Sequence, residues 1–501
     1  MTTPSPATTV TTVDVAATAP ESAESIAILL GPGDRDDSLG IEAARLAAAG
    51  FDGTVGSALI VPAGTGPIVV AVGIGEPSEL DAARLRDAAA AYAQATANHE
   101  RLALRLPDLP ATLDQAAGQA VVEGVLLARY RYDQLRSDAS AKPVREITIV
   151  TGDDRVEAVE RGGRRGHVYA AATMRVRDLA NTPHSHLTAS QLADIARQLG
   201  QDHGFDVEVF DPDAIREMRL GGLLAVNAGS AEPPRMIKLT YRPTGEATGR
   251  LAMVGKGIMF DSGGLSLKPS DATHAQMKND MTGAAAVLSA VAALGELGAT
   301  TAVTGYLMCT DNMPSATATV LGDVYTARNG KTVEVIDTDA EGRMVMSDAL
   351  ALAAEDNAND AVVDIATLTG SVGRALGNEV AGVLGNSQPL IDQVRAAAAA
   401  TDEPVWQLPL YRPYRRHLKS TVADIANVAP LGSPDGIMAA LFLAEFVGDL
   451  PWAHIDIAGV ATNTTSRTWH PEGCSGFGTR LLIQLATEFR RNRLNPAHDN
   501  R

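Results

Sequence analysis

Three lysines lie close together in a chain that otherwise relies on arginine. The chain has 7 lysines and 35 arginines, yet Lys256, Lys268 and Lys278 fall within a stretch of 23 residues. A desolvated lysine can lose its proton, and its neutral amine can then donate a lone pair to a metal ion, whereas arginine stays charged. The grouping therefore indicates amine chemistry, with chance clustering as the alternative.

Carboxylates accompany these lysines. Lys256 follows an expected strand in VGKGIMFDSGGLSLKP (254–269), where Asp261 comes five residues later. The glycines of this segment predict a tight loop that can approach a ligand closely. Asp280, in MKNDMTGAAAV, immediately precedes an expected helix. Capping of that helix is the ordinary alternative for Asp280, because aspartate is a favoured N-cap residue.

A third segment, VIDTDAEGRMVMSDAL (335–350), is the most acidic. It places Asp337, Asp339 and Glu341 within five residues, beside Arg343. Three carboxylates at the end of one strand repel each other unless cations lie between them. A solvated acidic turn explains Asp337 well, but it explains Asp339 and Glu341 less well because they lead directly into an apolar helix.

Together these residues predict a hard, oxygen-rich metal site. Lysine and several carboxylates without histidine favour Mg, Mn or Zn over copper or iron–sulfur chemistry. The carboxylates suffice for two ions at roughly 3.5–4 Å separation, the arrangement that activates a water and polarises a carbonyl. The residues alone therefore predict a two-metal hydrolase and leave its substrate open.

The elements that must position these residues alternate between strands and helices. In the first part of the chain, expected strands at 26–30, 57–63, 67–75 and 146–152 alternate with helices at about 79–97 and 112–130. After Thr182-Pro183 the pattern restarts with a helix at 188–199. The later strands are expected at 207–210, 221–229, 236–241, 251–255, 301–308, 362–368 and 453–459, and the later helices at about 282–297, 342–355, 436–447 and 478–491.

This alternation predicts an α/β fold with a largely parallel sheet. The carboxyl ends of the strands at 251–255, 301–308 and 362–368 are expected to form the ligand crevice. We expect a disordered tail (1–25), an N-terminal α/β domain (26–165), a linker helix (166–184) and a C-terminal catalytic domain (185–501). The tail is predicted from its Thr, Ala, Ser and Pro content.

Composition and missing motifs exclude several classes of protein. The formal charge of −18 gives no reason to bind nucleic acid or an anionic membrane. No Walker A, HExxH or GxSxG pattern occurs. This excludes the common P-loop nucleotide-binding proteins, the zincin proteases and the serine hydrolases with a GxSxG turn. No secretory signal, transit peptide or apolar run of about 18–20 residues is present, so a cytoplasmic protein is expected.

Several segments resemble the catalytic half of the leucyl aminopeptidase family. The likeness covers most of residues 175–490, and its most specific parts are KGIMFDSGG and DTDAEGR. It also includes MKNDMTGAAAV, VVDIATLTGSVGRALG, RVRDLANTP, GGLLAVNAGSAEPPRMIKLTY and PWAHIDIAG. The resemblance implies a cytosolic two-metal exopeptidase that assembles as a homohexamer, a dimer of trimers. It also implies two domains, a macro-domain-like α/β domain and an α/β/α sandwich that carries the metals.

The resemblance assigns the ligands of two divalent ions, Mn or Zn and possibly Mg. It implies that Asp261 and Glu341 contact both ions, that Lys256 and Asp280 complete the looser site, and that Asp339 completes the other.

The resemblance also assigns the proton chemistry. Lys268 would hydrogen-bond the substrate carbonyl and stabilise the developing oxyanion. Arg343 would hold a bicarbonate ion that shuttles the proton of the bridging water. The alternative for Arg343 is an ordinary ion pair with Asp337 or Glu334.

The implied substrate is a peptide with a free N-terminus, whose amine would bind one metal. The first side chain of the peptide would enter an apolar pocket, and the peptide backbone would form hydrogen bonds with the segment around Leu368. Ordinary core packing is the alternative for the methionine of this set. The residues implied for substrate binding are Met277, Thr367, Leu368, Gly370, Ala458 and Ala461.

Three positions depart from the pattern of the family. Asp337 stands where asparagine is usual, Asp435 where a glycine is usual, and Ala461 where some members have methionine. Two other functions stay open, a DNA-binding or regulatory protein and a metal-binding structural subunit without turnover. The charge of −18 disfavours the first, and the intact set of site residues disfavours the second.

Overall fold

The chain forms two compact units. A computed structural model describes residues 11–491, apart from 35, 37, 38, 40, 62–65 and 138–141. One unit consists of Met1–Met174 and Asn463–Gly473, the other of Arg175–Thr462 and Cys474–Arg501. Each unit has its own sheet and its own apolar core, which confirms the predicted two-domain α/β fold.

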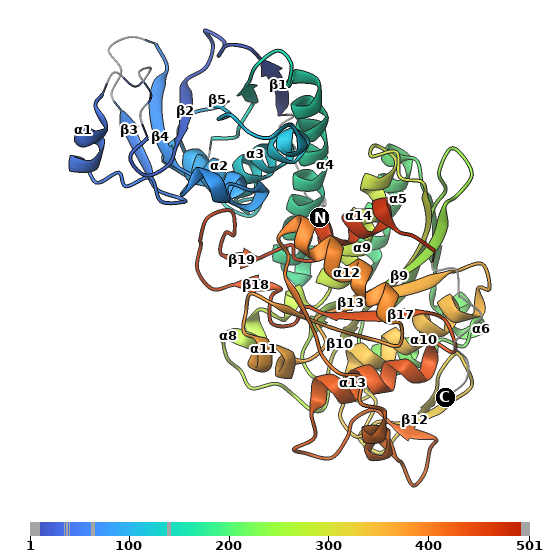
Figure 1. Ribbon diagram of the computed structural model, residues 1–501. Coiled ribbons are helices and arrows are strands. Elements are labelled where there is room, and N and C mark those ends of the chain that lie inside the picture. Colours follow the sequence, from blue (N-terminus) through green and yellow to red (C-terminus); the bar gives the residue numbers. More distant parts are fainter. Residues whose placement is uncertain are drawn as a thin grey trace. The chain divides into compact units, whose positions relative to one another are not determined.

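The sheet of the first unit has the strand order β1-β6-β5-β2-β4-β3 (Figure 1). All its pairs are parallel except that of β3 with β4. Its inner strand β2 reads SIAILL and is buried throughout, as a continuous apolar run in a parallel sheet requires. The elements of this sheet and its main helices are β1 (Thr12–Ala16), β2 (Ser25–Leu30), β3 (Ala58–Val61), β4 (Ile68–Gly73), β5 (Arg101–Arg105), β6 (Glu146–Val150), α1 (Ala43–Ala48), α2 (Ala82–Ala95) and α3 (Asp114–Arg129).

Two expectations for the first 184 residues are corrected. Strand β1 pairs in parallel with β6, so the disorder predicted for residues 1–25 is wrong for those that the structure describes. Its TVDVA sequence alternates around two β-branched valines, a short strand pattern that the Thr- and Ala-rich composition concealed. The helix expected at 166–184 is α4 (Val156–Asn181), which begins earlier and runs from one unit into the other.

The segment Asn463–Gly473 completes the first unit from a distant part of the chain. Trp469 is only 3% exposed and belongs to the apolar core of that unit. Its indole N–H donates to Asp87 at 3.1 Å, and the guanidinium of Arg86 lies 5.7 Å from the centre of its ring.

The sheet of the second unit has the order β15-β14-β17-β13-β9-β10-β8-β7. Its central strands β17, β13, β9 and β10 are parallel, as predicted, whereas β8 and β7 add an antiparallel edge and β14 runs antiparallel to β17. The strands are β7 (Asp206–Phe210), β8 (Arg235–Tyr241), β9 (Gly249–Asp261), β10 (Thr301–Asn312), β13 (Ala361–Ala366), β14 (Ala381–Gly385), β15 (Val405–Gln407) and β17 (Trp452–Asp456).

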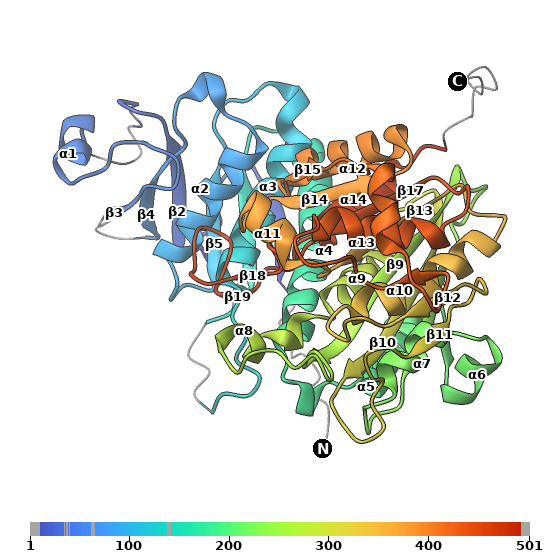
Figure 2. The same cartoon turned by 90° about the horizontal axis from the view of Figure 1, so that it is seen from below.

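Helices cover both faces of this sheet and form the predicted α/β/α sandwich (Figures 1 and 2). One layer contains α5 (Ala189–His203), α9 (Thr282–Leu294), α12 (Gln388–Thr401) and α14 (Thr479–Glu488), and the other contains α7 (Gly221–Asn227), α10 (Glu341–Glu355) and α13 (Asp435–Leu443). Both α9 and α10 pack directly on β9, so their N-terminal turns reach the carboxyl end of that strand.

The strand expected at 221–229 is instead helix α7. Its first two glycines allow close packing: a Cβ atom added at Gly222 would lie 2.1 Å from the carbonyl oxygen of Met344 on α10. Short apolar runs do not distinguish a strand from a buried helix, so the type of this element was predicted wrongly.

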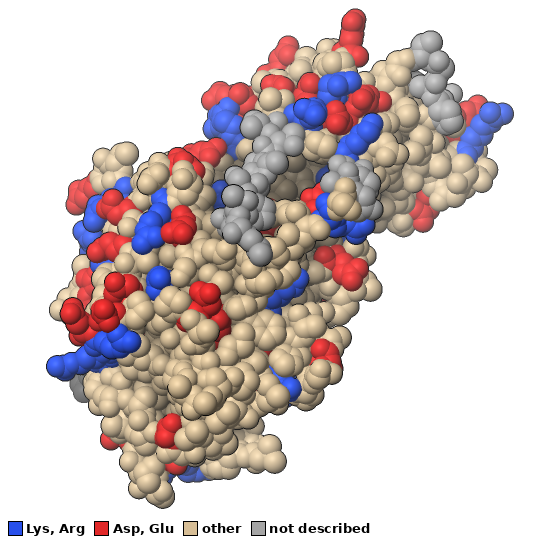
Figure 3. Space-filling view, turned by 180° about the vertical axis from the view of Figure 1, so that it is seen from behind, with Lys and Arg blue, Asp and Glu red and all other residues tan. Residues whose placement is uncertain are grey.

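Among the residues that the structure describes, none of the helices has the length and apolar character needed to cross a bilayer. On the face drawn in Figure 3, acidic and basic side chains are intermixed among the described residues and form no continuous basic stripe.

Candidate metal centre

A β-bulge turns two predicted site residues toward the same place. Strand β9 extends beyond its expected end at Gly255 and runs through Lys256 to Asp261. Residues five apart on a regular strand point to opposite faces. The register shifts, however: Ile258 pairs with Thr310 and Asp261 with Asn312, so β9 has one additional residue. Such a bulge re-aims the side chains that follow it, and Asp261 joins Lys256 at one site.

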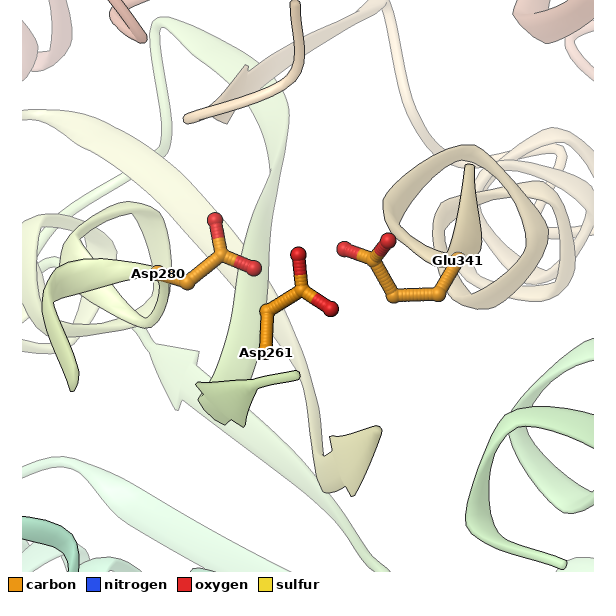
Figure 4. A group of neighbouring side chains, drawn as sticks. All are labelled: Asp261, Asp280 and Glu341. Atoms are coloured by element: carbon orange, nitrogen blue, oxygen red, sulfur yellow. The ribbon is translucent and has the colours of Figure 1, made fainter. Parts of the chain in front are cut away.

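Three carboxylates converge at this edge of the sheet. Asp261 comes from the end of β9, Asp280 from the turn before α9, and Glu341 from the first turn of α10, and their carboxyl groups point toward one another (Figure 4). One oxygen of each lies within 4.8 Å of the others, and all three residues are buried. Asp280 does not cap α9, whose N-cap position is Met281 without a side-chain cap.

Lys256 lies between two of these carboxylates. Its Nζ is 2.8 Å from both oxygens of Asp280 and 2.8 Å from Oε1 of Glu341, and it donates to the carbonyl of Thr367 at 3.0 Å. The side chain is 3% exposed. The fold therefore brings Lys256 and Asp280 together.

Lys268 and Asp339 lie at the more open side of the cluster. Lys268 Nζ is 2.7 Å from Asp261 and 2.5 Å from Asp339. Asp337 is not part of the cluster: its carboxylate accepts the backbone N–H of Asp339 at 2.9 Å and so orients that residue. The third lysine, Lys278, is also separate, since it donates to the carbonyl of Asn181.

One supporting residue of the cluster, Asn312, was not recognised from the sequence. Asn312, at the carboxyl end of β10, donates to Asp261 Oδ1 at 2.8 Å and to the carbonyl of Thr338 at 2.9 Å. It thereby connects β9 to the segment that carries Asp339. A polar residue at the end of a parallel strand was the available signal, because ligand crevices form at such ends.

The cluster carries more negative than positive charge. Burial, and then Asp261 and Glu341, raise the pKa of Asp339 to about 7. Burial is also the largest cause that raises the pKa values of Asp280 and Glu341. For both lysines burial acts the other way, but the carboxylates outweigh it and raise the pKa values of Lys256 and Lys268.

The residues fit divalent cations. Four carboxylates face two ammonium groups, which leaves negative charge for a cation to balance. Within the described residues, Asp280 Oδ2, Asp339 Oδ1 and Glu341 Oε1 are buried without a hydrogen-bond partner of good geometry, although lysine nitrogens lie close. Buried oxygens of this kind are the ligands that Mg and Mn prefer and that Zn accepts.

Arg343 follows Glu341 by two residues in α10, but its partners differ from those expected. It is 3% exposed, and it forms its ion pair neither with Asp337 nor with Glu334. Nη1 donates to the carbonyl of Asn427 at 2.9 Å, and Nη2 donates to Asp435 Oδ1 at 3.0 Å.

One donor of Arg343 has no partner among the described residues. A planar anion binds a guanidinium through two parallel N–H groups, and Nε and Nη2 form one such edge. Asp435 holds Nη2, while Nε is buried without a partner among the described residues. An anion on this edge would have to displace the Asp435 carboxylate or lie beside its negative charge. The bonds to Asn427 and Asp435 use only two of the five N–H groups of Arg343, so the bicarbonate implied by the resemblance stays a prediction.

The residues predicted to bind substrate lie along two loops and one short turn. The first follows β13: Thr367 donates its hydroxyl to Asp280 at 2.6 Å, and Gly370 is exposed at the start of α11 (Gly370–Leu376). The second follows β17 and contains Ala458, which is half-buried, and Ala461, which is buried. Met277, in a short turn before Asp280, is also half-buried.

Asp456, at the end of β17, joins these two loops. Its Oδ1 accepts the backbone N–H groups of Leu368 at 3.2 Å, Thr369 at 3.4 Å and Ala458 at 3.1 Å, and its Oδ2 accepts the Thr369 hydroxyl at 2.6 Å. Asp456 is 1% exposed. The sequence analysis did not select it, although it too stands at the carboxyl end of a parallel strand.

Comparison with known proteins agrees with this geometry. The model of the cytosol aminopeptidase family's catalytic domain matches residues 174–483, and that of the family's N-terminal domain matches residues 17–139. A probable cytosol aminopeptidase from Streptomyces avermitilis is 42% identical over 463 residues, covering 89% of this chain and 88% of the relative. One from Chlorobaculum tepidum is 44% identical over 375 residues, covering 73% and 74%.

A solved structure has the same architecture. The bottromycin maturation enzyme BotP in complex with Mn superimposes with a TM-score of 0.85 at 38% identity, covering 93% of this chain and 99% of its own. With both family domains matched and the acidic site in place, the chain belongs to the cytosol aminopeptidase family of metal-dependent aminopeptidases, which use two divalent metal ions.

Proposed function

We propose that this protein is a leucyl aminopeptidase, which releases leucine and other apolar residues from the N-termini of peptides. The observation that carries the proposal is the buried group of Asp261, Asp280 and Glu341 with a lysine on either side. That arrangement is suited to binding divalent ions next to a polarised carbonyl.

Five residues are proposed to hold two divalent ions. When bound, these ions supply an activated water and polarise the scissile carbonyl. Asp261 and Glu341 are proposed to contact both ions, Lys256 and Asp280 to complete one site, and Asp339 the other. Manganese or zinc is favoured, with magnesium possible by ligand chemistry; the Mn complex of the structural neighbour supports manganese.

Lys268 is the proposed electrophilic residue. It lies at the more open side of the cluster, and the neighbouring carboxylates favour its charged form. An ammonium group there donates a hydrogen bond to the substrate carbonyl and stabilises the oxyanion that develops on it. Arg343 is proposed to hold a bicarbonate ion, which would take up the proton of the attacking water; its buried Nε–H, without a partner among the described residues, supports an acceptor there.

The proposed substrate pocket lies between the loops that follow β13 and β17. The backbone of Leu368 and its neighbours Thr367 and Gly370 would bond to the peptide, and Met277, Ala458 and Ala461 would line the first side-chain pocket. Uncharged apolar walls favour leucine and similar side chains, since a buried charge without a partner is costly. A free α-amine as metal ligand would explain a requirement for the peptide's N-terminus.

The resemblance to the leucyl aminopeptidase family also supports proposals for the assembly of the protein and its location in the cell. We propose a homohexamer, a dimer of trimers, that acts in the cytoplasm without nucleic-acid or membrane partners. The formal charge of −18 supports the lack of nucleic-acid binding.

The solved structural neighbour favours a second candidate function. BotP is named a maturation enzyme, so a protein of this architecture acts in the processing of a specific product. Processing of one dedicated peptide would differ from general aminopeptidase activity in its selectivity. A panel of peptides with different first and second residues would separate the two, because only general activity would be spread over the panel.

The main test is hydrolysis of leucine-p-nitroanilide and of its N-acetylated form, before and after chelation. Cleavage of the free-amine substrate alone, lost on chelation and restored by Mn, Zn or Mg, is expected. Absence of cleavage with every metal by folded protein would refute the enzymatic proposal and favour a structural metal-binding subunit.

A further inference from the structure

The loop after β13 leads from the acidic cluster to the surface of the second unit. The hydroxyl of Thr367 donates to Asp280 at 2.6 Å, and the carbonyl of Thr367 accepts a hydrogen bond from Lys256 at 3.0 Å. Thr367 is half-buried, whereas Gly370 is exposed. Because a residue adds at most about 3.6 Å to an extended chain, the Cα atoms of Thr367 and Gly370 lie within about 11 Å of each other. The loop therefore joins the cluster to solvent over the length of a short peptide.

Arg374 lies over the exposed end of this loop. It belongs to α11, one helical turn after Gly370, and so it stands on the same face of that helix. A Cβ atom added at Gly370 would lie 3.5 Å from Nη1 of Arg374, which places the guanidinium itself against the glycine. A peptide bound at Gly370 is therefore next to a positive charge.

The helix that carries Arg374 is packed between the two proposed substrate loops. A Cβ atom added at Gly373 would lie 3.0 Å from the Cα atom of Gly459, which follows Ala458 in the loop after β17. On the other side, Val372 is 2% exposed. The backbone of Arg374 is thus held in place by packing, and its side chain starts from a fixed point.

The Arg374 guanidinium has no partner on the protein. Within the part of the chain that the structure describes, it forms neither a hydrogen bond nor an ion pair. Other exposed arginines of the second unit pair with carboxylates, as Arg197 does with Asp194 and Arg216 with Asp213. A guanidinium binds a carboxylate through two parallel N–H groups. The position and the unused donors of Arg374 suit a carboxylate that arrives with the substrate.

We propose that Arg374 binds the free C-terminal carboxylate of short peptides, of two or three residues, and makes them the preferred substrates. The inference rests on the proposed aminopeptidase activity. With the first residue at the metal centre, the second or third reaches the exposed end of the loop, because each residue of an extended peptide spans about 3.3–3.6 Å. In longer peptides the terminal carboxylate lies beyond the guanidinium. An acidic side chain at the second position is the other source of the same chemistry.

The test compares kcat/KM for Leu-Gly with kcat/KM for its amide, Leu-Gly-NH2, on full-length metal-loaded protein. The two substrates differ only in the carboxylate. An exposed ion pair contributes modestly, so wild type should prefer the acid by roughly 5-fold, mainly through KM. The preference should fall with rising salt, because salt screens exposed charges. It should also shrink for Leu-Gly-Gly-Gly-Gly and its amide.

Variants of Arg374 test the source of the preference, with the amide as the reference substrate within each protein. Arg374→Ala should remove the preference and Arg374→Glu should reverse it, whereas Arg374→Lys keeps the charge and should retain part of it. Arg395→Ala is the matched control: Arg395 is also an exposed arginine on a helix of this unit, and its loss should leave the preference at the wild-type value.

A second pair of substrates, Leu-Asp-NH2 and Leu-Asn-NH2, tests the acidic side chain as the source of the carboxylate. A preference for Leu-Asp-NH2 without one for Leu-Gly would overturn the assignment to the C-terminus. Equal kcat/KM for Leu-Gly and its amide in wild type, or a preference that persists in Arg374→Ala, would overturn the inference as a whole.

Calorimetric titration gives a readout that does not depend on turnover. The probe is a reduced-bond analogue of Leu-Gly, in which CH2 replaces the scissile carbonyl, compared with the amide of that analogue. Wild type should bind the acid roughly 5-fold more tightly than the amide, and Arg374→Ala should bind them equally. Inactivity of wild type on every substrate would refute the proposed function, and this titration would still decide whether Arg374 binds the carboxylate.

Discussion

Replacing Asp456 by asparagine should loosen the proposed substrate loop without removing a metal ligand. Asparagine has nearly the same shape but no charge. Its single carbonyl oxygen can still accept the N–H groups of Leu368, Thr369 and Ala458. Its amide then faces the Thr369 hydroxyl, which must change from donor to acceptor.

The expected loss follows from these bonds. A hydrogen bond to a charged acceptor contributes roughly 1.5–3 kcal/mol and a neutral one roughly 0.5–1.5 kcal/mol, so each N–H bond weakens by about 1 kcal/mol. The three N–H bonds, at 3.1–3.4 Å, are longer than usual. We therefore expect Asp456→Asn to lower the free energy of unfolding by about 2 kcal/mol in total.

The assay is urea unfolding together with steady-state kinetics and metal content. Because the loop carries backbone groups proposed to bind the peptide, KM should rise several-fold while the metal content stays that of wild type. Asp356→Asn is the matched control: Asp356 also accepts a backbone N–H but is exposed, so its loss should cost under about 0.5 kcal/mol. Wild-type stability and KM in Asp456→Asn would refute the reasoning.

Three further perturbations test other parts of the fold. Gly222→Ala places a Cβ atom 2.1 Å from the Met344 carbonyl and should destabilise the protein by about 1–3 kcal/mol in urea unfolding; Gly245→Ala, which meets nothing within 4 Å, should be nearly neutral. Burial raises the pKa of Asp348 to about 7, so folding favours its protonated form. The contribution of Asp348 to stability is present at low pH and is lost as the pH rises from about 4 to about 7. The free energy of unfolding of Asp348→Asn should not show this loss, and unfolding of both proteins at several pH values measures the difference. Trp469→Ala should lower the unfolding free energy by about 3–5 kcal/mol, and a loss under about 1 kcal/mol would contradict its assignment to a core.

The sequence predicted most of the elements that carry the site. The helices after Asp280 and at Glu341 begin within a residue of their expected positions, because apolar runs with clear starts define them. Asp261, Asn312 and Asp456 each stand at the carboxyl end of a parallel strand. Their hydrogen bonds across the sheet depend on tertiary pairing.

Local sequence patterns do not determine the pairing register of neighbouring strands. The bulge in β9 is visible only when that strand is paired with β10, yet it decides whether Lys256 and Asp261 face the same way. The partner of Arg343 was also misjudged: the expected acidic neighbours were near in sequence, whereas Asp435 comes from another helix. Pairings between distant segments are fixed by packing, which a single sequence leaves open.

The placement of Trp469 has a consequence for the order in which the protein is made. Residues 1–174 leave the ribosome early, but Asn463–Gly473, which belongs to the same compact unit, is synthesised almost last. Until then the nascent unit exposes the apolar surface that the indole later covers. Exposed apolar surface makes folding intermediates prone to aggregation, so the first unit to be translated stays open to aggregation until one of its last-made segments is available.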